Sequence, residues 1–190
     1  MSEGNINFSF DTRNVKMIPF DKYDKNFTFI VDGKRYETSR FIADIYSPII
    51  CKYHYDDETI DEFTISSTSE NEQSDQTFHE FLTLINKGKI ELNNQQRSKY
   101  GEYFLLLGNI DEYFRLNPLN KDNLTPENVI DRLNFIQKVK PSEFIENENV
   151  QQIIKYASEH FFETPVEKVK KLEIILLEEM IKNRNLRIEN

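Results

Sequence analysis

The segment from Phe27 to Thr38 constrains the fold of this chain most strongly. Every second position from Phe27 to Val31 carries a large apolar side chain, as in a strand with one well-buried face. Asp32-Gly33 follows directly, and a second alternating run continues to Thr38. Asp-Gly between two such runs predicts a β-hairpin with a type I′ turn, because that turn needs positive φ at both central residues. The chain must therefore contain an antiparallel strand pair at this point.

The apolar period changes directly after the predicted hairpin. Thr38 or Ser39 is available as the N-cap of a helix. Pro48 either ends this helix or restarts it as a second turn. The apolar positions that follow at helical spacing are Phe41, Ile42, Ile45 and Ile49.

Further elements alternate between strand and helix. Phe63 and Ile65 predict a third strand, and residues 67–76, which include no apolar side chain, predict an exposed loop. The spacing of Thr77 and Glu80 predicts a capping box that opens a helix ending at Gly88. A short strand follows at Ile90 and Leu92, and then a helix from about Gln95 to Leu107 and a shorter one from Ile110 to Leu116.

The order of these elements resembles a BTB/POZ domain over residues 25–116. The residues that carry the resemblance are Phe29, Val31, Gly33, Tyr36, Arg40, Ala43, Ser47 and Pro48. Two positions depart from the family pattern. Ser39 stands where the family usually has His, and Asn26 replaces an acidic residue, so the buried Asp–Arg pair of many members cannot form. The resemblance implies an α+β fold in which a small mixed sheet is capped by helices.

The regions on either side of this domain have different patterns. Residues 1–24 predict an N-terminal arm that adds a strand or packs as an extended segment, and residues 117–124 predict a polar linker. Residues 125–190 predict three helices, which begin at Thr125-Pro126, near Val150 and at Thr164-Pro165. Their order resembles the helical BACK-type extension of BTB/POZ proteins. The last helix has no stop signal, so we expect the natural polypeptide to continue beyond Asn190.

Charge and composition argue against several classes of partner and cofactor. The net charge of −9 argues against nucleic acid and against anionic membranes as partners. The single cysteine, Cys51, rules out an intrachain disulfide framework, and the polar start is unlike a signal peptide. We therefore expect a cytoplasmic protein, with the nucleus as the alternative. Five glycines without a Gly-x-Gly motif give no phosphate-binding loop, and we expect no cofactor.

Residues 51–58 hold the candidates for chemistry. His54, Asp56 and Asp57 are the one cluster with metal-binding residue types, and they define an alternative function as a metal-dependent enzyme or hydrolase. A solvated acidic loop is the competing interpretation. Cys51 lacks a His or Asn partner for a catalytic thiol, so we interpret it as a core thiol. The sequence therefore predicts a protein that is not an enzyme.

The function predicted from these observations is a protein–protein interaction module, which assembles or adapts a larger protein. The BTB/POZ resemblance implies homodimerisation and, in some members, recruitment of a cullin-type ubiquitin ligase through a hydrophobic-x-acidic motif. Tyr55-Asp56-Asp57 is the nearest fit to that motif, so the predicted partner-binding residues are Tyr53, Tyr55, Asp56 and Asp57. The helices from Thr125 would then form a second wall of the binding groove. A linker subunit of such a ligase is a further alternative.

Overall fold

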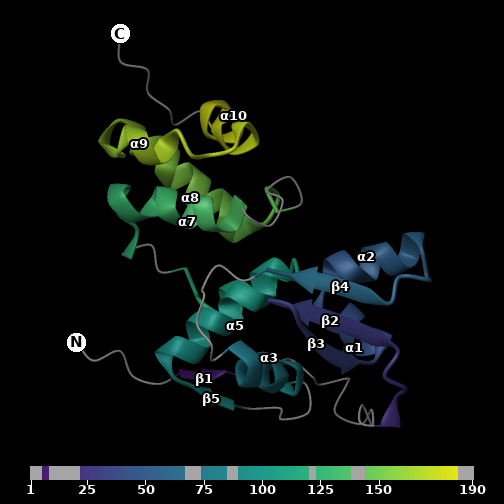
Figure 1. Cartoon of the computed structure of the whole chain (residues 1–190). Coiled ribbons are helices and arrows are strands. Elements are labelled where there is room, and N and C mark those ends of the chain that lie inside the picture. Colours follow the sequence, from purple (N-terminus) through teal and green to yellow (C-terminus); the bar gives the residue numbers. More distant parts are fainter. Residues whose placement is uncertain are drawn as a thin grey trace. The chain divides into compact units, whose positions relative to one another are not determined.

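The computed structural model describes residues 6–8, 22–66, 74–84, 90–119, 123–137 and 144–183. The chain forms two compact units, Met1–Asn117 and Pro118–Asn190 (Figure 1). The predicted α+β class is confirmed, since helices accompany a small three-stranded mixed sheet. The predicted linker 117–124 begins where the two units divide.

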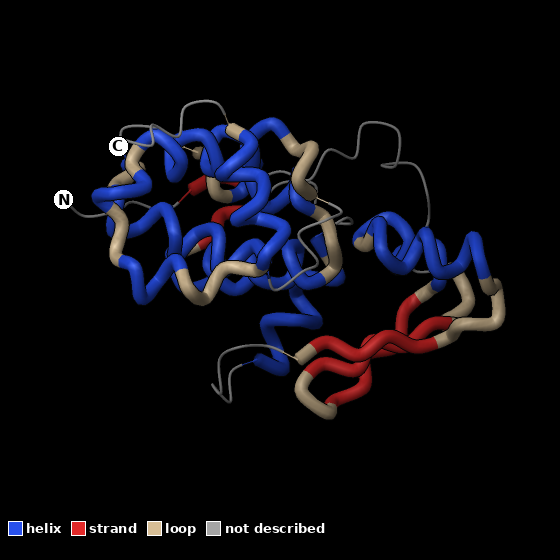
Figure 2. Tube along the Cα trace, turned by 90° about the horizontal axis from the view of Figure 1, so that it is seen from above, coloured by secondary structure: helices blue, strands red, loops and turns tan. Residues whose placement is uncertain are grey.

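The first unit is built around the three-stranded sheet. The strand order is β3-β2-β4, in which β2 is antiparallel to β3 and parallel to β4. Figure 2 shows helices running along one side of these strands. The bounds of the strands are β1 Ile6–Phe8, β2 Phe27–Val31, β3 Lys34–Thr38, β4 Glu62–Ile65 and β5 Ile90–Leu92; those of the helices are α1 Arg40–Tyr46, α2 Pro48–Asp56, α3 Ser74–Leu82, α5 Asn94–Leu106 and α6 Ile110–Leu116.

The predicted hairpin between β2 and β3 is confirmed. Asp32 has φ 50° and Gly33 has φ 82°, the two positive values that a type I′ turn requires. The register places Phe29 opposite Tyr36, and both side chains are buried. The alternation seen in the sequence therefore faces the core as expected.

The junction of α1 and α2 is fixed by capping serines. Ser39 caps α1, and its Oγ accepts a hydrogen bond from the N–H of Ile42. Ser47 caps α2, with Pro48 at the first helical position, so the proline restarts the helix rather than ending it. The buried Oγ of Ser47 also donates to the carbonyl of Leu107 at 2.7 Å, which ties this junction to the end of α5.

Aromatic rings from α1, α3 and α5 fill the core of the first unit. The ring centroids of Phe78 and Tyr103 lie 4.9 Å apart, as do those of Phe81 and Phe104, each pair in an edge-to-face arrangement. The buried hydroxyl of Tyr46 donates to the carbonyl of Phe81 at 2.9 Å. This core holds the helices that carry the residues discussed below.

Two predictions about the edges of this unit have different outcomes. The strand predicted within the N-terminal arm is confirmed for Ile6–Phe8, which pairs antiparallel with β5. The prediction of a capping box at Thr77 is wrong, because α3 already begins at Ser74 and Thr77 lies inside it. The predicted loop falls largely on residues 67–73 and the predicted stop on Gly88, and both lie outside the described residues.

The second unit consists of helices. Thr125 caps α7 through a capping box with Asn128, and Pro126 occupies the first position, as predicted. Apolar side chains of α7, α8 and α10 form the core, among them Leu133, Ile154 and Leu176. The bounds are α7 Pro126–Ile136, α8 Glu148–Glu159, a 3-10 helix Phe161–Glu163, α9 Val166–Val169 and α10 Ile174–Lys182.

The prediction of a single last helix that begins at Thr164 is wrong. Thr164 does not cap a helix, because its hydroxyl donates to the carbonyl of Phe161. The helix is interrupted after α9. At the break, the side chain of Gln137 replaces the hydrogen-bond partners that a continuous helix would give to the backbone. Its Nε2 donates to the carbonyl of Lys171, and its Oε1 accepts from the N–H of Glu173, both at 2.8 Å. A tertiary contact thus overrides the helical period.

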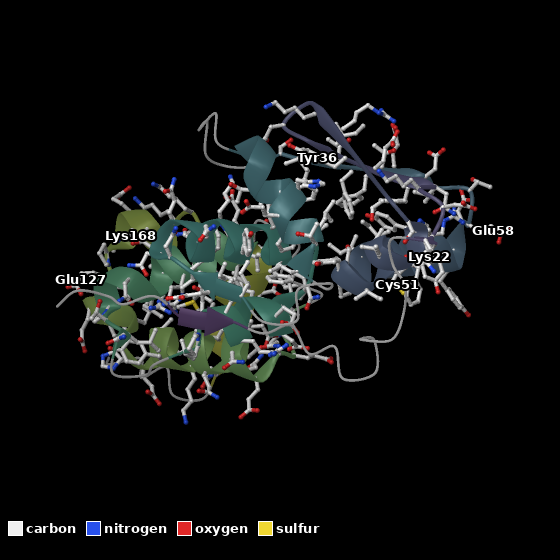
Figure 3. All side chains as sticks on the ribbon, turned by 90° about the horizontal axis from the view of Figure 1, so that it is seen from below. Lys22, Tyr36, Cys51, Glu58, Glu127 and Lys168 are labelled. Carbon is white, nitrogen blue, oxygen red and sulfur yellow. The ribbon has the colours of Figure 1, made fainter. Side chains whose placement is uncertain are left out.

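A lysine fixes α9 beside α7. The Nζ of Lys168 donates to the carbonyl of Glu127 at 2.7 Å and to the carboxylate of Asp131 at 2.5 Å. Glu127 and Lys168 lie side by side in the second unit (Figure 3). The polar face of α7 therefore holds the interrupted helix in place.

Candidate functional site

The predicted partner-binding residues lie on the last turn of α2 and just after it. The sequence placed them in a loop, but the helix continues through Asp56. Tyr55 is 91% exposed. Tyr53 is half-buried, and its ring lies 6.3 Å from that of Phe63 in β4. Positions two apart on a helix point to different sides, so Tyr53 supports the helix while Tyr55 faces solvent.

Asp57 ends α2 and is held by its own turn. Its N–H donates to the carbonyl of Tyr53, and its Oδ1 accepts from the N–H and the hydroxyl of Thr59 at 2.9 and 2.7 Å. These hydrogen bonds, with a smaller contribution from the charge of Arg40, lower the pKa of the Asp57 carboxyl below its usual value. The carboxylate is therefore an exposed, ionised group in a fixed orientation.

Three acidic residues follow Tyr55 without interruption. Asp56, Asp57 and Glu58 are all exposed. Figure 3 shows Cys51 on α2 and Glu58 beyond the end of that helix. The carboxyl end of a helix carries partial negative charge, so anions there do not stabilise the helix. Helix stability therefore does not explain this acidic run.

His54 points inward, away from the acidic run. Its side chain is only 7% exposed, with Nδ1 2.5 Å from Oδ1 of Asp44 and Nε2 3.0 Å from the carbonyl oxygen of Ile60. The edge of the imidazole contacts the ring of Phe27, with centroids 5.2 Å apart. Both ring nitrogens are thus engaged within the protein.

The alternative of a metal enzyme around His54, Asp56 and Asp57 is not supported by this geometry. Within the described part of the chain, no three His, Cys, Asp or Glu side chains form a group that could hold a metal ion. His54 faces Asp44 and Ile60, whereas Asp57 faces Thr59. The three residues are neighbours in sequence but do not converge on one point.

Cys51 is also not where the sequence suggested. It is a free and exposed cysteine on α2, not a core thiol. The apolar face of α2 is instead formed by Ile50, which is fully buried. The reason is the restart at Pro48, which sets the helical phase and turns Cys51 outward.

Sequence reasoning missed the residues that hold this region together. Asp44 precedes His54 by ten residues, across the break at Pro48, so no helical spacing relates them. Arg40 belongs to the family pattern, but its contacts are unexpected: its Nη2 donates to the carbonyl of Ile60 at 3.3 Å, and its backbone N–H donates to Oδ1 of Asn26 at 2.8 Å. Asn26 therefore supports the start of α1 instead of pairing with the Arg40 side chain.

Comparison with known proteins does not identify a relative. No protein-family model and no curated protein matches the chain. In the part of the chain that the structure describes, no helix has the length and apolar character needed to span a membrane.

Proposed function

We propose that this chain is a non-enzymatic protein–protein interaction module that serves assembly or adaptor roles within a larger protein. In this proposal the first unit is a BTB/POZ-like domain and the second a BACK-like helical extension. The observation that carries the proposal is Tyr55, a large aromatic side chain that is 91% exposed on a well-anchored helix.

The exposure of Tyr55 is significant because α2 is firmly anchored. Tyr53, Ile50 and His54 pack inward from the same helix, so the backbone at Tyr55 is fixed before any partner arrives. Aromatic side chains on rigid backbones make favourable binding anchors, because little conformational entropy is lost when they are buried. Phe41, 41% exposed and stacked on Tyr23, adds further apolar surface to the first unit.

The acidic run after Tyr55 supports the same conclusion. Asp56, Asp57 and Glu58 lie at a helix end where they are electrostatically unfavourable for the helix. A complementary basic patch or a helix N-terminus on a partner would be attracted to them. The combination of an exposed aromatic side chain with the fixed carboxylate of Asp57 suits a docking surface better than a solvated loop.

The order of elements supports the BTB/POZ-like assignment. A hairpin leads into two consecutive helices and then into β4, which returns parallel to β2. The Ser47-Pro48 pair, which the family pattern contains, forms the joint between these helices. The resemblance then implies homodimerisation as one form of assembly.

A cullin-type ubiquitin ligase is the second candidate partner. Tyr55 and Asp57 match the hydrophobic-x-acidic pattern of family members that recruit a cullin. Tyr55 would fill an apolar pocket, and the ionised carboxylate of Asp57 would face a helix N-terminus on the cullin. Asp is one methylene shorter than the usual Glu, which sets this chain apart from the pattern.

Two measurements on the purified full chain test the proposal. Light scattering coupled to size-exclusion chromatography reports the oligomeric state, and titration with cullin N-terminal fragments reports recruitment. We expect Tyr55→Ala to weaken whichever assembly forms by about tenfold or more, the loss typical of a hot-spot aromatic. Phe162→Ala is the matched control, because Phe162 is 70% exposed on the second unit. Equal effects of the two substitutions would overturn the role of Tyr55, and a monomer that binds no cullin would overturn both forms of the proposal.

A further inference from the structure

We propose that His54 is a proton-dependent clamp, which holds α1, α2 and the segment 57–61 together only while both of its ring nitrogens carry hydrogen. The clamp lies directly beneath the surface that presents Tyr55 and Asp57. It is a property of the free protein, so it can be tested without a partner, and its failure is distinguishable from failure of the proposed function.

The inference rests on the number of hydrogens that the two ring nitrogens of His54 must carry. Nδ1 faces a carboxylate oxygen of Asp44 at 2.5 Å, and Nε2 faces the carbonyl oxygen of Ile60 at 3.0 Å. An ionised carboxylate and a carbonyl only accept hydrogen bonds, whereas a neutral imidazole has one donor nitrogen and one acceptor nitrogen. A neutral ring beside ionised Asp44 would therefore leave one nitrogen lone pair facing an oxygen lone pair. A ring with hydrogen on both nitrogens satisfies both contacts.

The charged groups around the ring come from two of its neighbouring elements. From α1, Asp44 pairs with the ring directly, and Arg40 donates to the same Ile60 carbonyl that Nε2 contacts. From the turn after α2, Asp57 contributes a carboxylate that interacts with the charge of Arg40. From β2, the apolar ring of Phe27 packs against the imidazole. Asp44 is the carboxylate in direct contact with the ring, whereas Asp57 faces Thr59.

Loss of one ring hydrogen would loosen the segment that the clamp holds. Histidine is the side chain that normally changes charge near neutral pH. If Nε2 loses its hydrogen, Ile60 keeps only the longer bond from Arg40, and the repulsion between Nε2 and the carbonyl favours opening. The same segment pairs with the sheet, since the N–H of Thr28 donates to the carbonyl of Asp61 at 2.8 Å. Within the segment, the N–H of Ile60 donates to the carbonyl of Asp57 at 3.4 Å. The amides of Thr28 and Ile60 are therefore the reporters of opening.

The first measurement is the ring ¹⁵N chemical shifts of His54 in the labelled full chain, followed through a pH titration. His54→Gln assigns the signals, and the exposed His79 on α3 serves as a reference in the same spectra. We expect the ring shifts at the acidic end of the titration to be those of an imidazole with hydrogen on both nitrogens, because both contacts are acceptors. A single neutral tautomer throughout the titration would overturn the proposal.

The second measurement is amide exchange of Thr28 and Ile60 between about pH 6 and about pH 8.5, corrected for the intrinsic pH dependence of exchange. We expect protection to fall by about tenfold or more as the ring loses its second hydrogen, the loss typical of a hydrogen bond to a charged group. Protection that does not change while the ring titrates would show that His54 clamps nothing.

Asp44→Asn separates the clamp from general pH effects. The asparagine amide can donate to Nδ1, so a neutral ring with hydrogen on Nε2 then satisfies both contacts. We expect protection of Ile60 in this variant to stay constant within about twofold over the same pH range. A fall as large as that in the unmodified chain would contradict the proposal. If the variant does not fold, the ring shifts and exchange of the unmodified chain decide the question.

Discussion

Replacement of Gln137 tests why the last helix of the second unit is interrupted. Its side chain amide makes two hydrogen bonds to backbone groups at the break, to the carbonyl of Lys171 and from the N–H of Glu173. Each bond contributes about 0.5–1.5 kcal/mol, so Gln137→Ala removes about 1–3 kcal/mol in total. Both bonds are exposed and water can replace part of them, so we expect about 1–2 kcal/mol.

The assay is amide exchange at the start of α10. The N–H groups of Leu176 and Leu177 both donate to the carbonyl of Glu173, directly after the break. We expect Gln137→Ala to raise their exchange rates about five- to thirtyfold, the factor that 1–2 kcal/mol implies. Gln137→Met, which keeps the shape of the side chain, should behave in the same way.

The matched control for Gln137 is Gln152 on α8, whose side chain makes no hydrogen bond to another described residue. Gln152→Ala should leave the exchange rates of Leu176 and Leu177 unchanged. Equal rates in the Gln137 and Gln152 variants would refute the account of the break.

The remaining predictions concern the first unit. Gly33→Val should lower the free energy of unfolding by about 1–3 kcal/mol through its positive φ alone, since a Cβ at Gly33 meets no atom within 4 Å. Gly33→Asn should cost clearly less in the same chemical denaturation, and equal costs would argue against backbone strain. Tyr46→Phe should lower the free energy of unfolding by about 1–2 kcal/mol because its hydroxyl is hydrogen-bonded. Tyr100→Phe should leave it unchanged because that buried hydroxyl has no partner among the described residues. The reverse order of stability would contradict this. Because the pKa of Asp57 is lowered, its carboxylate stabilises the turn at pH values above the usual aspartate pKa. This stabilisation is lost as the pH falls through the lowered pKa. Amide exchange of Thr59 that is unaffected by acid would contradict this prediction.

Local signals in the sequence were sufficient where the structure depends on local chemistry. The hairpin follows from Asp32-Gly33, because few residues tolerate positive φ at two successive positions. The start of α7 follows from Thr125-Pro126, where the cap and the first-turn proline act within one turn. These features need no knowledge of distant contacts.

The sequence was insufficient where distant side chains decide the structure. The continuous helix expected after Thr164 is divided by Gln137, a residue of another helix. The direction of His54 is decided by Asp44 and by the carbonyl of Ile60, which comes from an irregular segment. Of the predicted partner-binding residues, Tyr53 turned out to support the helix, because the restart at Pro48 fixes a helical phase that a loop does not have.

Site-specific photo-crosslinking at position 55 tests the central claim most directly. A photoreactive phenylalanine derivative replaces Tyr55 in the full chain, which is expressed in its native cells, and the same substitution at Gln152 is the control. The account predicts one product of discrete mass from position 55, either a second copy of the chain or a distinct protein. This product should be lost when Asp57→Lys reverses the neighbouring charge. Crosslinking at position 55 that does not exceed the Gln152 control, or that is unaffected by Asp57→Lys, would contradict a partner surface at the end of α2.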